Sequence, residues 1–413
     1  MQLQKFDIPC PGGQTLSALL DLPADGKPMA YALFAHCFTC SKDLKAIYHI
    51  SRTLTRERIG VLRFDFTGLG ESGGDFADTS LLSNVEDLVA AAGFLASRFE
   101  GPQLLIGHSF GGAAVLQAAA EIPSARAVVT IAAPADPRHV SKSLGPARES
   151  IASRGQAEVN IAGRTFTLRK KFLDDLGRIE PEVVIQNLNR ALLVMHSPLD
   201  DVVGIENAAR IFQAARHPKS FVSLDQADHL LSNLADSRYA GAVIAAWAKR
   251  YIVTRSAAET SAPATDTRTT ARTGRSGFLT EILVNRHSLV ADEPVQSGGT
   301  DQGPTPFDLL VAALGACTSM TLRMYADRKG WPLEAATVRL KHEKIHAAEC
   351  EACETREGML DRIEREVELE GPLDPEQKQR LLQIADRCPV HRTLTSETVI
   401  ATRLKDDPER RDD

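Results

Sequence analysis

Short apolar runs separated by amphipathic segments make up the N-terminal part of the chain. Runs typical of buried parallel strands occur at four places: 30–35, 103–106, 126–132 and 190–196. Residues 112–120 and 206–215 have the apolar periodicity of helices. This alternation predicts an α/β domain over residues 1–252, with a mostly parallel sheet and helices on both of its faces.

A different pattern begins near Gly277. The expected elements, in order, are strands at 278–284 and 287–291, a long apolar helix at 307–329, strands at 336–345 and 362–369, a helix at 373–388 and a strand at 397–404. This order predicts a second, α+β domain over residues 277–405. Residues 253–276, rich in Ser, Thr and Ala, predict a flexible linker, and residues 406–413 a solvated tail.

The composition narrows the classes of function. Acidic residues outnumber basic ones 54 to 48, and basic runs with interleaved aromatics are missing, so we expect no nucleic-acid surface. We also expect a cytoplasmic protein without a membrane span, because no secretory signal follows Met1 and the most apolar helix contains Asp308 and Arg323. Seven cysteines without an export signal indicate thiol, ligand or redox chemistry instead of a disulfide framework.

The most informative motif is Gly107-His108-Ser109-Phe110-Gly111, between a predicted strand and a predicted helix. A serine between two glycines at such a turn is typical of a nucleophile elbow, in which only glycines leave room for the backbone to pass. Ser109 Oγ is therefore expected above the sheet, at a helix N-terminus. The N–H of Phe110, the residue after the nucleophile, is one expected donor of an oxyanion hole.

The other members of a catalytic triad are expected after later strands, in the order Ser, Asp, His. Asp200 follows the strand at 190–196, and His229 follows the strand at 220–224. Both therefore come just past the C-terminal ends of successive strands, where catalytic groups gather in open α/β sheets. Asp201 is the rival acid, and the alternative is that Asp200 caps a helix and His229 is a surface residue.

Two further segments resemble the α/β-hydrolase superfamily, particularly its small bacterial esterases and acyl hydrolases. They are the loop His36-Cys37-Phe38-Thr39 after the strand at 30–35 and the turn from Asp65 to Ser72, in which Asp65 is expected to be structural. The resemblance covers about residues 1–252 and implies that the N–H of Phe38 is the second oxyanion donor. The chain departs from the family in having Cys37 and Cys40 at glycine positions, where we expect reduced, packed thiols, the alternative being oxidative regulation.

More than fifty residues separate the strand at 126–132 from the strand at 190–196, which is far longer than a plain crossover loop. Alternating residues at 157–161 and 165–168 predict a hairpin, and 170–176 a helix. We expect this insertion, about residues 134–189, to form a small cap over Ser109. The alternative is an insertion away from the site.

The C-terminal part resembles the osmotically inducible protein C (OsmC) and organic hydroperoxide resistance superfamily. The resemblance is carried by the motifs at 298–306, 314–321 and 385–394, the last being Ala-Asp-x-Cys-Pro-Val-His-Arg-Thr-Leu. A hydrolase followed by such a domain resembles the bifunctional α/β hydrolase/OsmC family. This implies a homodimer formed through the C-terminal half, with active sites at the subunit interface.

The family peroxidases use two cysteines, which match Cys317 and Cys388, to reduce an organic hydroperoxide with a thiol as reductant. They also use a glutamate before the central helix and an early arginine, for which Asp308 and Arg286 are the candidates here. The alternative for Cys317 is an apolar filler of a buried helix.

Cys350 and Cys353 form a C-x-x-C pair near His342 and His346. Such a pair can hold a metal or cycle between thiols and disulfide. We favour a thiol pair or disulfide over zinc, and expect no metal and no cofactor.

Three functions remain open. The first is a serine hydrolase cleaving carboxylic esters or related acyl compounds through an acyl-enzyme at Ser109. The second is a thiol peroxidase as the main activity. In the third, the OsmC-like half is mainly a dimerisation and lipophile-binding module.

Overall fold

The computed structural model describes residues 2–138, 144–161, 164–252, 268–275, 277–285, 287–349 and 357–404. The chain divides into two compact units. The first, called the N-terminal unit below, comprises Met1–Arg272 with Glu281–Leu289, and the second comprises Thr273–Thr280 with Val290–Asp413. Each unit is described by itself.

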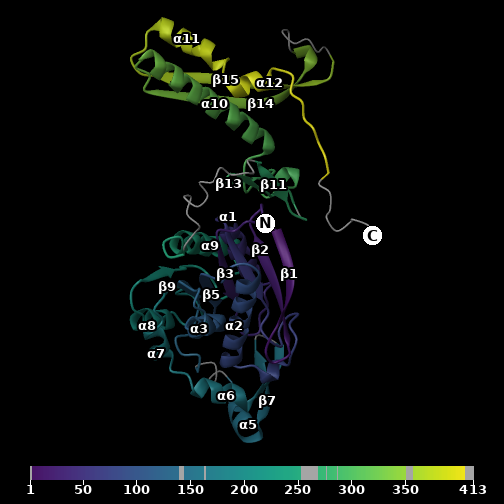
Figure 1. Cartoon of the computed structure of the whole chain (residues 1–413), viewed down its shortest axis with the longest axis vertical. Coiled ribbons are helices and arrows are strands. Elements are labelled where there is room, and N and C mark those ends of the chain that lie inside the picture. The colour runs from purple at the N-terminus through teal and green to yellow at the C-terminus, as the bar shows by residue number, and fades with distance from the viewer. Residues whose placement is uncertain are drawn as a thin grey trace. The chain divides into compact units, whose positions relative to one another are not determined.

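An eight-stranded sheet organises the N-terminal unit (Figure 1). Its strands are β1 (Gln2–Pro9), β2 (Thr15–Leu22), β3 (Ala30–Ala35), β4 (Ile59–Phe64), β5 (Leu104–His108), β6 (Ala127–Ile131), β9 (Ala191–His196) and β10 (Lys219–Ser223). They lie in the order β1-β2-β4-β3-β5-β6-β9-β10. The first two pairings are antiparallel and the others parallel. The mostly parallel sheet is thus the predicted one.

Helices cover both faces of this sheet because alternate side chains of each strand point to opposite sides. In β5, Leu105 packs in one core with α2 (Leu81–Arg98), α3 (Phe110–Ala118) and α8 (Glu206–Ala214). The neighbouring Leu104 and Ile106 pack in a second core with α1 (Lys45–Arg56) and α9 (Leu234–Ala248).

The insertion between β6 and β9 forms a small cap at one end of the N-terminal unit, where Figure 1 labels α5, α6 and β7. Its elements are α5 (Pro146–Arg154), the antiparallel hairpin β7 (Gln156–Ile161) and β8 (Arg164–Arg169), α6 (Lys170–Gly177) and α7 (Pro181–Gln186). The predicted hairpin and helix are confirmed. Phe172 of α6 is fully buried in the first core, and Ser80 at the start of α2 donates to Asp175 at 2.7 Å.

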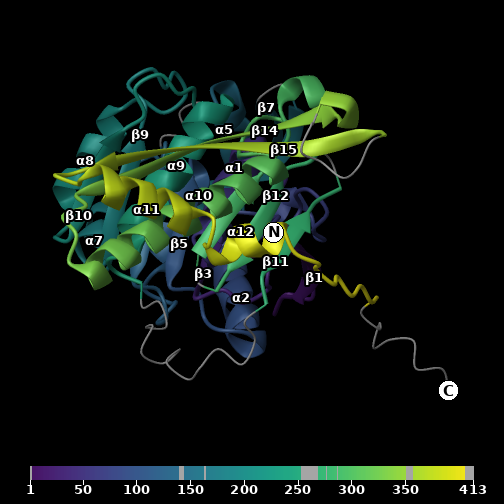
Figure 2. The ribbon, with the colours of Figure 1, turned by 90° about the horizontal axis from the view of Figure 1, so that it is seen from above.

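The second unit contains a long antiparallel hairpin with helices along it, as Figure 2 shows for α10 and α11 beside β14 and β15. Its elements are α10 (Pro306–Lys329), β14 (Ala335–His346), β15 (Met359–Glu370), α11 (Pro375–Ala385) and α12 (Pro389–Leu394). Before them in the chain, β11 (Thr270–Thr273), β12 (Thr280–Val284) and β13 (His287–Ala291) form a three-stranded sheet whose residues are divided between the two units. Short 3-10 helices occur at Phe76–Asp78, Val295–Ser297 and Ala347–Glu349.

One expectation for the C-terminal part is confirmed and another is wrong. The helix expected at 373–388 is observed as α11, and a separate short helix, α12, follows it and begins at Pro389, a residue suited to the first turn of a helix. The segment 397–404 is not a strand: it pairs with no described strand, and Val399, Ile400 and Leu404 are almost fully exposed. A strand forms only where its backbone N–H and C=O groups pair with those of a neighbouring strand, which the apolar pattern of the segment alone does not supply.

By length and composition alone, α10 could cross a membrane, contrary to the expectation from Asp308 and Arg323. The core helix of a soluble protein passes the same test, so this finding is weak evidence. Leu322 and Ala326 on one side of α10 pack against α11 in the core of the second unit.

Candidate active site

Ser109 lies at the sharp turn between β5 and α3, with a φ of 54° and ψ of −122°. A positive φ is strained for a residue with a side chain. The two glycines leave no room for one: a Cβ at Gly107 would lie 2.3 Å from Gly111 O, and a Cβ at Gly111 would lie 2.4 Å from His36 O. The predicted need for glycine at both positions is confirmed. Phe110 begins α3, so its N–H has no partner within the helix.

Two later loops bring a histidine and an acid to this serine. His229 Nε2 lies 3.0 Å from Ser109 Oγ, within reach of a hydrogen bond from the hydroxyl. On the other side of the ring, His229 Nδ1 lies 2.7 Å from Asp200 Oδ2 and donates to it. All three residues are buried, with side-chain exposure of at most about a tenth. The structure thus brings together the three residues that the motifs single out.

Asp200, not Asp201, faces His229; Asp201 is exposed. Burial by itself would raise the pKa of Asp200. His196, His229 and the N–H of Val203 outweigh burial and hold this pKa well below its usual range. The carboxylate is therefore charged and able to orient the His229 ring.

Two buried histidines beside this group were not predicted from the sequence as residues of the site. His108 Nε2 donates to the backbone oxygen of His229 at 2.7 Å, and burial, followed by the charge of His229, lowers the pKa of His108 to about 4. His196 Nε2 donates to Val203 O at 2.7 Å and lies 3.5 Å from Asp200 Oδ2. Both histidines stand at the ends of strands, the signal that pointed to the other site residues.

The loop after β3, residues 36–43, carries Phe38 and approaches the start of α3 through Gly111. Cys37 and Cys40 form a disulfide, so the expectation of reduced thiols is wrong. Thr39 has a φ of +68°, which turns the backbone so that the two cysteine Cα atoms lie 5.3 Å apart, within the usual range for a bridge.

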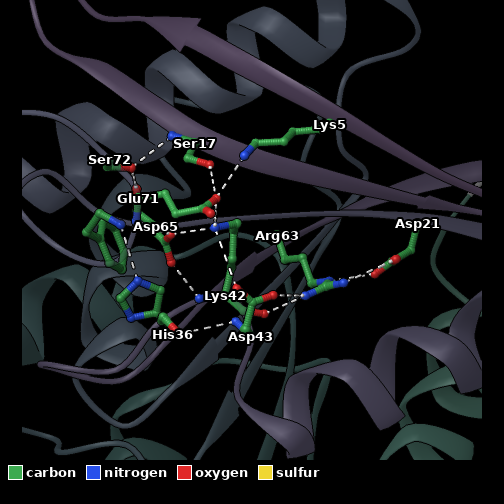
Figure 3. Close-up of polar contacts among 12 residues, drawn as sticks. Lys5, Ser17, Asp21, His36, Lys42, Asp43, Arg63, Asp65, Glu71 and Ser72 are labelled. Carbon is green, nitrogen blue, oxygen red and sulfur yellow. Dashed lines mark hydrogen bonds and ion pairs between the residues drawn. The ribbon is translucent and has the colours of Figure 1, made fainter.

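Buried polar groups fix both ends of the 36–43 loop (Figure 3). At its start, His36 donates from Nδ1 to Cys37 O and accepts the N–H of Phe66 at Nε2. At its end, the N–H and Nζ of Lys42 both donate to Asp65, at 2.7 Å each. Lys42 and Asp65 are fully buried, so the structural role expected for Asp65 is confirmed.

Arg63 and Glu71 complete this anchor. Arg63 donates to Lys42 O at 2.7 Å and to Asp21 at 2.7 Å, and Lys42 Nζ donates to Glu71 at 3.0 Å. Hydrogen bonds from Lys42, Lys5 and Ser17 lower the pKa of Glu71 to about 2.

Aromatic rings from the 36–43 loop, from Phe110 at the start of α3 and from the cap pack together next to Ser109. The ring of Phe38 lies 5.0 Å from that of Phe110, 5.3 Å from Phe76 and 5.6 Å from Phe172 of the cap. The cap also reaches the loop through Arg164, whose Nη1 donates to Thr39 O at 3.1 Å. The insertion therefore lies at the site, as the sequence predicts.

The second unit places its two candidate thiols on adjoining helices. Cys317 lies in α10 and is partly exposed, whereas Cys388 is buried at the N-terminus of α12. Thr318 Oγ1 lies 3.5 Å from Cys388 Sγ. Arg365 of β15, which the sequence analysis missed, donates to this same Thr318 oxygen at 3.2 Å.

Of the acid and the arginine expected near these thiols, Asp308 lies among the described residues and Arg286 does not. Asp308 accepts from the N–H and hydroxyl of Thr305 in a capping box at the start of α10. Asp308 and Cys317 are nine residues apart in one helix, which corresponds to about 13 Å along the helix axis. The role expected for Asp308, beside a redox cysteine, would therefore require the Cys317 of a second chain. Arg286, Cys350 and Cys353 lie outside the described residues. In the part of the chain that is described, no group of three acidic, His or Cys side chains is placed to hold a metal.

Comparisons with known proteins fit both units. The model of the "Alpha/beta hydrolase family" matches residues 32–274, and that of "OsmC-like protein" matches residues 299–403. No curated protein matches the chain.

Among solved structures, the esterase domain of a Rhodothermus marinus protein is 53% identical over 61% of this chain and 100% of its own length, with a TM-score of 0.53. Est1E from Butyrivibrio proteoclasticus with ferulic acid is 22% identical over 58% and 97%, with a TM-score of 0.52. Mouse alpha/beta hydrolase domain-containing protein 10 is 17% identical over 60% and 99%, also with a TM-score of 0.52. The last two show a shared fold alone.

Proposed function

This chain belongs to the alpha/beta hydrolase family and ends in an OsmC-like domain, and we propose that it is a serine hydrolase cleaving carboxylic esters or related acyl compounds. The observation that carries the proposal is the continuous contact from Ser109 through His229 to Asp200, at 3.0 and 2.7 Å. The 53% identity to a solved esterase domain supports the same class of reaction.

The geometry suggests the roles of these groups. His229 Nε2 takes the proton of Ser109 as Oγ attacks the acyl carbon, and later gives it to the leaving group. Asp200 holds the ring and stabilises its cation. The N–H groups of Phe38 and Phe110 stabilise the oxyanion, and water then releases the acyl group from Ser109. The phenyl rings beside Ser109 favour an apolar acyl group.

The test is hydrolysis of short p-nitrophenyl esters by the full chain. We expect Ser109→Ala to lower kcat by about a thousandfold or more, because the nucleophile is lost. Ser97→Ala, at an exposed serine near the end of α2, is the matched control and should leave kcat unchanged. Equal activity of Ser109→Ala and the wild type would exclude the proposal.

A second candidate function, thiol-dependent reduction of organic hydroperoxides, is favoured by the position of Cys388 next to α10. In this function the Cys317 thiolate takes one peroxide oxygen, becomes a sulfenic acid and releases an alcohol. Cys388 then condenses with it to a disulfide and water, and a thiol reductant restores both cysteines.

Cys317→Ser and Cys388→Ser should each abolish hydroperoxide consumption and leave ester hydrolysis intact, measured on the same full-length samples. If the wild type consumes no hydroperoxide, the OsmC-like domain is better explained as a dimerisation and lipophile-binding module.

A further inference from the structure

The Cys37–Cys40 disulfide has no part in the catalytic contacts, yet it encloses one of them. It closes a ring over Phe38 and Thr39, and the N–H of Phe38 is the proposed second oxyanion donor. Cys37 is 3% exposed and Cys40 is partly exposed, so Cys40 is the more accessible end of the bridge.

The enclosed backbone is held in a disfavoured conformation. Thr39 is β-branched and has a φ of +68°, a region that such residues rarely adopt and that persists only where the surroundings enforce it. The bridge joins the residues two before and one after Thr39, and is therefore placed to enforce this turn and the position of Phe38.

The other restraints on this segment are non-covalent. His36 fixes the residue before the bridge, and Lys42 fixes the chain two residues beyond it. Between the cysteines, the N–H of Cys40 donates to Cys37 O at 3.2 Å, Arg164 of the cap donates to Thr39 O, and the ring of Phe38 packs on three other phenyl rings. Opening the bridge would thus leave two hydrogen bonds to hold the Thr39 turn, while the Phe38 ring and the ends of the loop stay anchored.

We propose that Cys37–Cys40 is a reversible redox site that regulates the hydrolase; the proposal rests on the function proposed above. A dithiol reductant attacks Cys40 Sγ at the more accessible end of the bridge, the S–S bond breaks, and Cys37 leaves as a thiolate. The second reductant thiolate then releases Cys40, so the protein gains two thiols and the reductant becomes a disulfide.

A hydroperoxide reverses the step. One thiolate takes a peroxide oxygen to form a sulfenic acid and releases an alcohol, and the second thiol condenses with it to re-form the bridge and release water. The reduced loop leaves the strained turn at Thr39, the N–H of Phe38 shifts from the oxyanion position, and kcat falls while substrate binding is largely retained.

The experiment measures ester hydrolysis by the full chain before and after dithiothreitol, with alkylation and peptide mass spectrometry to count the thiols at Cys37 and Cys40. Loss of one oxyanion donor costs 10²–10³ in kcat, and since this donor is displaced, not deleted, we expect kcat to fall about tenfold with KM changed less than twofold. Cumene hydroperoxide should restore it.

Two variants separate the bridge from other thiols. Cys37→Ser with Cys40→Ser should have the low kcat with or without dithiothreitol, whereas Cys10→Ala, at a free buried cysteine of the same unit, should respond like the wild type. Should the double variant fail to fold, the wild-type measurement decides alone. Equal kcat with the thiols confirmed, or a bridge that dithiothreitol cannot open, would overturn the proposal.

Failure of the proposed function has a different signature. A fluorophosphonate would then label neither the oxidised nor the reduced chain at Ser109, and neither form would hydrolyse the ester. The redox proposal would fall with it.

Discussion

Some buried ionisable residues of the N-terminal unit have a partner of opposite charge, and others are held only by hydrogen bonds to neutral groups. Lys42 and Asp65 neutralise each other beneath the 36–43 loop. Asp87 of α2 is 2% exposed and accepts from the N–H and hydroxyl of Thr67, at 2.8 and 2.9 Å. Burial outweighs these two bonds and raises the pKa of Asp87 from 3.8 to about 6. The folded chain therefore favours the protonated form of this carboxyl more than the unfolded chain does.

This raised pKa predicts a pH-dependent effect of Asp87→Asn. Between about pH 4 and 6 the folded chain holds the Asp87 proton that the unfolded chain releases, so this group's contribution to the free energy of unfolding declines as pH rises through that window. The amide does not titrate. The variant should therefore gain about 2–3 kcal/mol relative to the wild type between pH 4 and 7. Urea unfolding at both pH values measures this gain, and a difference independent of pH would contradict it.

Residues of the candidate site can be predicted from the sequence when the pattern of strands and helices determines their position. Ser109, Asp200 and His229 each follow a recognisable strand, and parallel strands end at one edge of a sheet. Asp200 and Asp201 follow the same strand, so only the structure distinguishes them. The disulfide could not be predicted because it depends on the positive φ of Thr39, for which a threonine gives no signal.

At the scale of elements, the predicted strands and helices of the N-terminal unit are observed, with ends shifted by a few residues. The α9 helix begins at Leu234, where the side chain of Asn233 caps it. In the second unit the pattern misleads where an element depends on a neighbour. The segment 397–404 has the apolar content of a strand, but no described edge of this chain pairs with it.

One face of α10, on the side away from the core of the second unit, also exposes apolar side chains. Cys317, Met320 and Met324 are spaced three and four residues apart, so they lie along one side of the helix. Met320 and Met324 are 64% and 71% exposed. An apolar stripe of this kind marks a surface for association, and it includes one of the two candidate redox thiols.

For the whole molecule, we propose that a second copy of the chain covers this stripe. Met320→Glu with Met324→Glu should convert a dimer into a monomer, because it places charges in the apolar contact. The matched variant Met320→Leu with Met324→Leu should remain dimeric. Light scattering of the full-length proteins at micromolar concentration gives the mass directly, and a monomeric wild type would exclude the dimer.

The contact between Gly111 and the carbonyl of His36 has a wider consequence. The helix that follows Ser109 and the loop that carries Phe38 approach each other through main-chain atoms, because Gly111 has no side chain to separate them. Their spacing is consequently set by the path of two backbones. Under the proposed function, substitutions among the phenyl rings and in the cap could change the acyl group that is accepted without changing the distance between Ser109 and the proposed oxyanion donor.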